Sequence, residues 1–318
     1  MLFAHETWFT EDRPPFEWGF LTEPETLLVL AATLLVVVAW VVASTRLARP
    51  ELPFLSPFAR LTPWVPRLLA IHAGASLVSQ AASGSYLVPA LDLPGGVAGT
   101  LLAALEAIVG VWLVAGYRIR PAAILLVLAG PLGALGYGLL PIVERIDLLG
   151  IALFLAILPP DDSRPGGIVE PRDRRLPAAL FGLRVLVGGA LVILAFTEKL
   201  IRPELALAFL DDFDAFNIFQ AIGIGMSDLD FVRFAGAMEL LFGVLVISGR
   251  LPQIAVIAAG IPFNATLFFL GSSELVGHLP IYGAMLALLI YGSDERTADM
   301  VGWFPKRRTE IPLPQREP

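Results

Sequence analysis

The sequence predicts an all-α integral membrane protein with nine transmembrane helices, the N-terminus outside and the C-terminus inside. Hydrophobic residues make up 56% of the 318 residues and charged residues only 16%, with a mean hydropathy of +0.75. Soluble domains average about 45–50% apolar and about 25% charged residues. Apolar runs close to the roughly 20 residues that cross a bilayer recur along the chain, and Lys and Arg gather in alternate loops. These observations exclude a soluble enzyme.

The first predicted span runs from Leu27 to Ala43 and ends before Arg46 and Arg49. The segment Phe54–Leu61 follows it and is expected to lie along the membrane interface. The remaining spans are predicted over residues 67–82, 97–116, 122–140, 147–158, 178–196, 231–248, 254–270 and 275–291. The fifth span is short for a bilayer, but a different number of spans would scramble the alternation of basic loops.

The orientation follows from the distribution of Lys and Arg between the loops. With the N-terminus outside, all but five of the 22 basic residues fall on the inside, as the positive-inside rule requires. The five on the outside are Arg13, Arg145, Lys199, Arg202 and Arg233. The protein is therefore expected to be a multi-pass protein of a prokaryotic inner (plasma) membrane.

The predicted organisation has six parts. An acidic extracytoplasmic tail covers residues 1–25, and its six acidic residues against Arg13 are unlike the basic start of a signal peptide. The other parts are a leading helix with the interfacial segment (26–63), a four-helix unit one (64–158), a cytoplasmic linker (159–177), a four-helix unit two (178–291) and a polar cytoplasmic tail (292–318).

The two units read as a parallel internal duplication. Arg67 opens unit one and Arg184 opens unit two, and Glu106 and Glu239 each lie inside the second helix of their unit. The same alignment pairs Pro121 with Pro252, Pro131 with Pro262, Gly150 with Gly283, and Arg145 with His278. Because each unit has four spans, both units have the same orientation, unlike the inverted repeats of many transporters.

Unit two resembles the DoxX family of four-helix membrane proteins. The resemblance rests on "GGALVILAFTEKLIRPELALAFL", "FAGAMELLFGVLVISGR" and "PFNATLFFL", in which Lys199, Glu239 and Arg250 match the family pattern. Unit one is a diverged copy with Ala82 in the place of Lys199. The resemblance implies a membrane subunit of a quinone-linked redox system, and many family members have no established activity.

Glu239 and Glu106 are the most informative candidate site residues. A carboxyl group inside a span is costly unless it is paired, protonated or facing a cavity. Each is therefore either an acid that accepts protons or binds a ligand head group, or a structural hydrogen-bonding group between helices. Lys199, at the outer end of its span, either contacts Glu239 or a ligand carbonyl, or extends to the lipid head groups.

His278 and Asn264 are weaker candidates. His278, at the outer end of the last span beside Glu274, is a candidate proton carrier during quinol oxidation, or an interfacial histidine. Asn264 either binds a quinone carbonyl or makes a cross-helix hydrogen bond. His72 lies near the inner end of its span, so it cannot pair with His278 on one haem. With no cysteine in the chain, we expect no metal site and no redox cofactor beyond a bound quinone.

The expected partners are membrane lipid and a redox protein or membrane complex, and no nucleic acid. The segment 203–230 reads as an amphipathic interfacial stretch, and its acids Asp211, Asp212 and Asp214 are either a solvated face or a docking patch for an extracytoplasmic partner. Three functions follow: a quinone-linked redox subunit with its site in unit two, a non-enzymatic scaffold or anchor of a larger complex, and a small-molecule permease. Whether the chain is an enzyme stays open.

Overall fold

The protein is a bundle of long apolar helices, described here from a computed structural model that covers residues 6–10, 13–159, 169 and 173–305. The first part of the chain contains η1 (Glu6–Trp8), η2 (Trp18–Thr22), α1 (Pro24–Ser44) and η3 (Pro53–Trp64). Unit one contains α2 (Val65–Ser83), β1 (Ser85–Tyr86), β2 (Val88–Asp92), α3 (Gly96–Ala115), α4 (Ile119–Tyr137), α5 (Leu139–Val143) and α6 (Ile146–Ile157).

Unit two begins with α7 (Leu176–Leu194), which continues into a π-helical turn, η4 (Ala195–Leu200). It continues with α8 (Pro203–Asp212), η5 (Asp214–Phe216), α9 (Ile218–Ala221), α10 (Asp228–Ser248), α11 (Pro252–Ser293) and, after the unit, α12 (Ala298–Val301). Parts of the predicted linker and C-terminal tail lie outside the described residues.

Six of the described helices are long and apolar enough to cross a membrane. They cover residues 24–44, 96–115, 119–137, 176–200, 228–248 and 252–293. Helix α1 has an exposed apolar surface, on which Leu28 and Leu35 are 72% and 70% exposed. Such a face is stable against lipid and not against water. The chain is thus a predominantly helical, multi-pass membrane protein.

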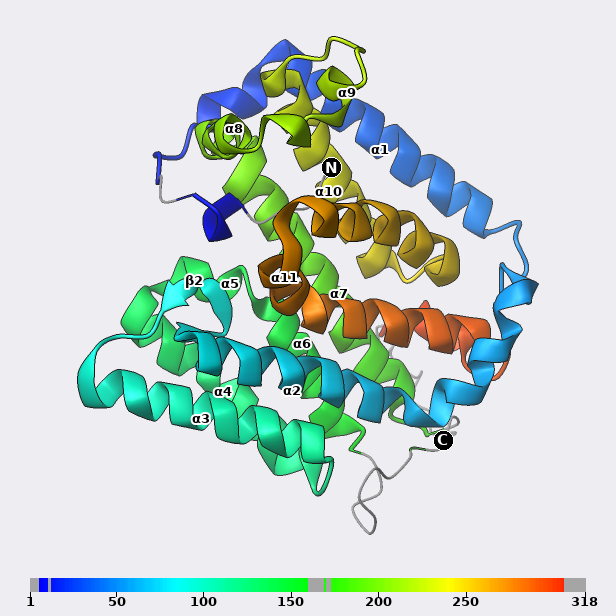
Figure 1. Cartoon of the computed structure of the whole chain (residues 1–318). Coiled ribbons are helices and arrows are strands. Elements are labelled where there is room, and N and C mark those ends of the chain that lie inside the picture. The colour runs from blue at the N-terminus through cyan, green and yellow to red at the C-terminus, as the bar shows by residue number, and fades with distance from the viewer. Residues whose placement is uncertain (1–5, 11–12, 160–168, 170–172, 306–318) are drawn as a thin grey trace, which may run out of the picture.

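Each of the nine predicted spans has a helix, but their number as membrane crossings remains a prediction. Helix α6 has only 12 residues, and the short helix α5 precedes it. The eighth and ninth spans form the single 42-residue helix α11, which is broken at Gly271, where φ is 66° and ψ is −141°. Figure 1 shows α11 in orange, bending sharply at this break, so its two halves run in different directions.

The two ends of the bundle differ in their connections. We call the end that carries η1, the β1–β2 hairpin, α5 and α8–α9 the tail end, and the end that carries η3 and the turns after α3 and α10 the linker end. The antiparallel hairpin β1–β2 stands where unit two has α8 to α9. The sequence reading did not predict this hairpin.

Close glycine contacts join the first two helices of each unit in the same way. A Cβ atom on Gly74 of α2 would lie 2.6 Å from the carbonyl oxygen of Gly110 on α3. A Cβ atom on Gly188 of α7 would lie 2.5 Å from the carbonyl oxygen of Gly243 on α10. Small residues let the two backbones touch, which is a major source of helix association in lipid.

The last helix of each unit packs on the first helix of the other. Gly150 of α6 faces Leu186 of α7, where a Cβ would lie 2.9 Å from the leucine Cβ. Gly283 of α11 faces His72 of α2 with the corresponding distance of 2.8 Å. Each unit thus contributes its last helix to a contact with the first helix of the other unit. Two parallel copies related by a common twofold axis would pack in this way.

The backbone geometry that the two units share at their turns corrects one detail of the predicted alignment. Arg118 and Leu251 both have φ of 47° and directly precede α4 and α11. Pro252 follows Leu251 at once, whereas Pro121 comes three residues after Arg118. The proline pairs are therefore out of register by two residues, because the prolines only need to lie in the first helical turn.

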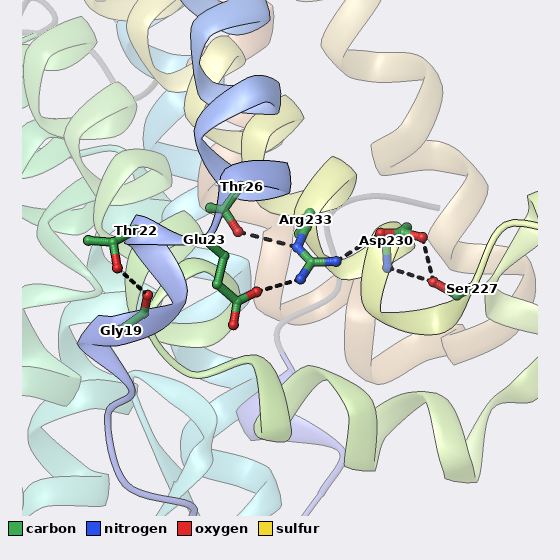
Figure 2. Close-up of polar contacts among 7 residues, drawn as sticks. All are labelled: Gly19, Thr22, Glu23, Thr26, Ser227, Asp230 and Arg233. Atoms are coloured by element: carbon green, nitrogen blue, oxygen red, sulfur yellow. Dashed lines mark hydrogen bonds and ion pairs between the residues drawn. The ribbon is translucent and has the colours of Figure 1, made fainter.

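The leading helix α1 is fixed to unit two at both ends. At the tail end, Arg233 of α10 donates to Glu23 at 2.5 Å and to Thr26 at 3.3 Å, and it pairs with Asp230 at 2.8 Å (Figure 2). At the linker end, the indole of Trp40 donates to the carbonyl oxygen of Arg250 at 3.1 Å. These contacts hold α1, and the N-terminal tail before it, next to α10.

Candidate functional site

The site begins with the π-helical turn η4 at the end of α7. A π-turn adds a residue to the helical turn and often occurs at functional sites. Here it turns both Glu198 and Lys199 into the protein, where they are 0% and 2% exposed. Of the two alternatives for Lys199, extension to the lipid head groups does not match this burial, and contact with Glu239 does.

Lys199 is the centre of a buried ionic cluster. Its Nζ lies 2.9 Å from a carboxylate oxygen of Glu6 and 3.1 Å from Oε2 of Glu239. The side chains of Glu6, Lys199 and Glu239 are at most 5% exposed. Buried charges are retained when they are paired and hydrogen-bonded, so each of these groups depends on the others.

The N-terminal segment Glu6–Trp8 closes the cluster from the tail end. Figure 1 shows this segment, η1, in dark blue between α8 and β2. The hydroxyl of Thr7 donates to Glu198 at 2.5 Å. The ring of Trp8 lies 5.0 Å from the imidazole of His278 and is covered by the guanidinium of Arg145 at 5.8 Å.

The same ring explains the glycine at position 277. A side chain at Gly277 would collide with the six-membered ring of Trp8, so only glycine lets the tail lie this close to α11. Because Trp8 contacts both Arg145 of unit one and His278 of unit two, it lies at the junction of the two units. Residues Glu6 to Trp8 therefore belong to the site as much as the helices do.

His278 sits in a second part of the cluster on α11. Its Nδ1 lies 3.3 Å from Glu274, and its ring centroid lies 5.1 Å from that of Phe263. Both His278 and Glu274 are fully buried. Glu274 is close enough to Glu239 for their charges to interact, so the acids on α10 and α11 form one connected region.

The cluster has more carboxylates than cations. Glu6, Glu198 and Glu239 all face the single ammonium group of Lys199. Burial raises the pKa of Glu6 well above its usual range, and the nearby charges of Glu198 and Glu239 add to this effect while Lys199 opposes it. Like charges that share one cation are relieved by binding protons. The chemical capacity of this arrangement is thus proton storage and exchange.

The structure brings together three of the five predicted site residues. Glu239, Lys199 and His278 belong to the region described above. Asn264 does not, because its side chain is exposed and donates to the carbonyl oxygen of Gly260 on its own helix at 2.7 Å. The prediction that Asn264 binds a quinone carbonyl has no support from this position.

Glu106 lies apart in unit one. Its Oε1 accepts a hydrogen bond from the backbone N–H of Leu87 at 2.9 Å. Leu87 is in the hairpin turn with φ of 62°. Glu106 thus pairs with a backbone N–H, whereas Glu239 at the corresponding position of unit two pairs with Lys199. The hydrogen bond of Glu106 anchors the hairpin.

Sequence reasoning missed Glu6 and Trp8. The sequence predicts an acidic extracytoplasmic tail over residues 1–25 and assigns it no contact with the helices. No local pattern shows that a carboxylate 193 positions before Lys199 pairs with it. The unusual number of acids between residues 1 and 25 was the only available signal.

The acidic segment 203–230 forms a cap over unit two. Phe209 and Phe216 pack inside it, with their ring centroids 4.9 Å apart. Asp211 and Asp212 are exposed on its outer face, whereas the side chain of Asp214 lies outside the described set. The placement of Asp211 and Asp212 agrees with both alternatives for these acids, a solvated face and a docking patch.

Comparisons with family models, with curated proteins and with solved structures give no match to this chain. The resemblance to the DoxX family therefore stays a prediction.

Proposed function

We propose that the chain is a DoxX-like membrane subunit of a quinone-linked electron-transfer system. In this proposal the quinone head binds in unit two, against Lys199 and Glu239, and electrons come from a partner protein. The observation that carries the proposal is the buried cluster of carboxylates around one lysine. Such a cluster can supply the protons that quinone reduction takes up and accept the protons that quinol oxidation releases.

The contact between the tail and Lys199 supports a quinone site at this lysine. The carboxylate of Glu6 accepts from the ammonium of Lys199, which is the hydrogen bond that a quinone carbonyl would make. Neither of two cavities near the site, described in the next subsection, is lined by Lys199 or Glu239. The proposal therefore requires that the quinone head replaces Glu6 and the indole of Trp8.

A scaffold or anchor subunit is the second candidate. It is favoured by the same ion pairs, because Glu239 and Lys199 pair with each other and with the tail, as a purely structural group would. In that case Glu6 to Trp8 simply fasten the N-terminus. A permease has no specific observation in its favour.

Photolabelling with an azido-quinone separates the two candidates. The proposal predicts labelled peptides from α7, α10 or the second half of α11, stronger labelling in Glu6→Ala, and a loss in Glu239→Gln. Glu106→Gln is the matched control, since it removes a buried carboxyl group from the corresponding position of unit one. Unchanged labelling in Glu6→Ala and Glu239→Gln would favour the scaffold.

A further inference from the structure

Unit one contains an apolar cavity of about 450 Å³ between α4, α5 and α6. Its walls include Leu126, Ile142 and Leu149, and its rim includes the exposed residues Pro131 and Leu139. Leu139 is 70% exposed, so the cavity is reached from the lipid-facing surface of the bundle. An apolar cavity of this size, open to the bilayer, fits an acyl chain.

Arg145 is the one charged residue in the wall of this cavity. It is 4% exposed, its Nη2 lies 3.2 Å from Asp147, and the same atom donates to the carbonyl oxygen of Gly277 at 3.4 Å. Within the described part of the chain, its Nε and Nη1 have no hydrogen-bond partner. Leaving two buried guanidinium donors without acceptors is costly, so this site favours a ligand that supplies oxygen acceptors.

Arg145 also lines a second, polar cavity of about 230 Å³ at the tail end. Arg13, Arg202 and Glu144 line the same cavity. The Nε of Arg202 is buried and lacks a hydrogen-bond partner among the described residues. The side chain of Arg145 therefore lines both cavities, of which the first is apolar and the second is lined by three arginines.

The charge around the second cavity favours an anion once Glu144 is protonated. Three arginines line the cavity with Glu144, and the carboxylates of Asp147 and Glu198 lie close to them, so the charges balance when all three acids are ionised. Burial, together with the charge of Glu198, raises the pKa of Glu144 to about 7. An excess of one positive charge therefore arises near neutral pH and below.

In unit two, a larger side chain stands at the place that corresponds to the wall of the apolar cavity. Gly130 and Phe263 both lie twelve residues after the turn residues Arg118 and Leu251. The ring of Phe263 packs edge-on against His278, which corresponds to Arg145 by the same count. A phenylalanine fills in unit two the space that glycine leaves open in unit one.

We propose that these two cavities, which share Arg145 in their walls, bind one anionic phospholipid, with an acyl chain between α4 and α6 and the head-group phosphate at Arg145 and Arg202. The phosphate oxygens accept from the guanidinium nitrogens that lack partners, and the surrounding bilayer supplies the lipid. Basic pockets between membrane helices bind anionic head groups in this way. Lys199 and Glu239 do not line this site, whereas Thr7 and Trp8 of the N-terminal tail line its head-group end.

Spin-labelled lipids test the site in phosphatidylcholine nanodiscs that contain the full chain. The probes are phosphatidylglycerol, phosphatidylcholine and stearic acid, each labelled on the acyl chain, and the readout is the immobilised fraction by electron paramagnetic resonance. Gly130→Phe closes the apolar cavity as Phe263 does in unit two. Gly136→Phe on the same helix is the matched control, since a Cβ there has no neighbour within 4 Å.

The wild-type protein is expected to immobilise phosphatidylglycerol with about tenfold higher affinity than phosphatidylcholine. Gly130→Phe abolishes this component and Gly136→Phe keeps it. The double variant Arg145→Gln/Asp147→Asn, which leaves no unpaired buried charge, keeps chain binding but loses the preference for phosphatidylglycerol. Equal affinity for the two phospholipids, a preference for stearic acid, or an unchanged signal in Gly130→Phe would overturn the proposal.

Discussion

The anchoring of the N-terminal tail by Glu6 leads to a quantitative prediction. Glu6→Ala removes the hydrogen bond that Lys199 donates to this side chain at 3.0 Å, which belongs to the ion pair between the two groups. The side chain of Glu6 is 5% exposed, so solvent does not replace this bond while the tail is seated. A hydrogen bond to a charged group contributes about 1.5–3 kcal/mol to stability.

This loss corresponds to roughly a tenfold to hundredfold increase in the population with the tail released, since 1.36 kcal/mol is a factor of ten. The amides of Phe9 and Thr10 report this population, because both donate to the carbonyl oxygen of Glu6 at 3.0 Å. Their hydrogen exchange, measured by mass spectrometry in detergent, should accelerate by that factor in Glu6→Ala.

Glu17→Ala is the matched control, since its side chain is exposed on the same tail. Its exchange at Phe9 and Thr10 should equal that of the wild type. If Glu6→Ala exchanges at the wild-type rate, the ion pair does not hold the tail, and the account of the cluster is wrong.

The seating of the tail should also depend on pH. The pKa of Glu6 is raised by burial, so the released tail loses its proton first as the pH rises above about 4.3. The seated state then binds more protons than the released state, and seating weakens with rising pH until the raised pKa is passed. Glu6→Gln keeps the acceptor for Lys199, so its tail should stay seated without this pH dependence. Stronger protection at pH 8 than at pH 5 in the wild type would contradict this assignment.

Three further predictions concern the helix packing and the anchoring contacts around the site. Gly188→Val should cost about 1–3 kcal/mol by overpacking against α10, seen as a lower thermal midpoint in detergent, whereas Gly136→Val on the open face should change it little. Arg233→Met should loosen the start of α1, with faster proteolysis near Glu23 and a cost of about 1 kcal/mol, because its partners are partly exposed. Glu106→Ala should free the hairpin, with at least tenfold faster exchange of its amides, and unchanged exchange there would refute the anchoring role.

The apolar pattern predicted most of the fold. Helices α1, α3, α4, α7 and α10 lie close to their predicted ranges, because lipid requires long apolar helices with internally bonded backbones. The pattern did not show the hairpin β1–β2, since it depends on the backbone conformation at single residues. The break at Gly271 lies between the predicted spans 254–270 and 275–291. Membrane crossings therefore remain harder to count than helices.

The candidate site was predictable only where the chemistry of a single residue is unusual. Glu239 could be predicted because a glutamate inside an apolar helix is unusual. Its pairing with Lys199 was one of the alternatives that the sequence left open. The contributions of Glu6 and Trp8 depend on tertiary packing across the whole chain, which leaves no local pattern. The cavity at Arg145 depends on an absence of side-chain volume at Gly130, and only a structure displays that.

The most direct test of the proposed function is the quinone content of the protein itself. The full chain would be purified in mild detergent, extracted with organic solvent and analysed by mass spectrometry, beside the Glu239→Gln variant. The proposal predicts about one quinone per chain in the wild type and its loss in the variant. Absence of quinone from the wild type, or equal amounts in both proteins, would contradict it and leave the ion pairs of Lys199 with a structural role.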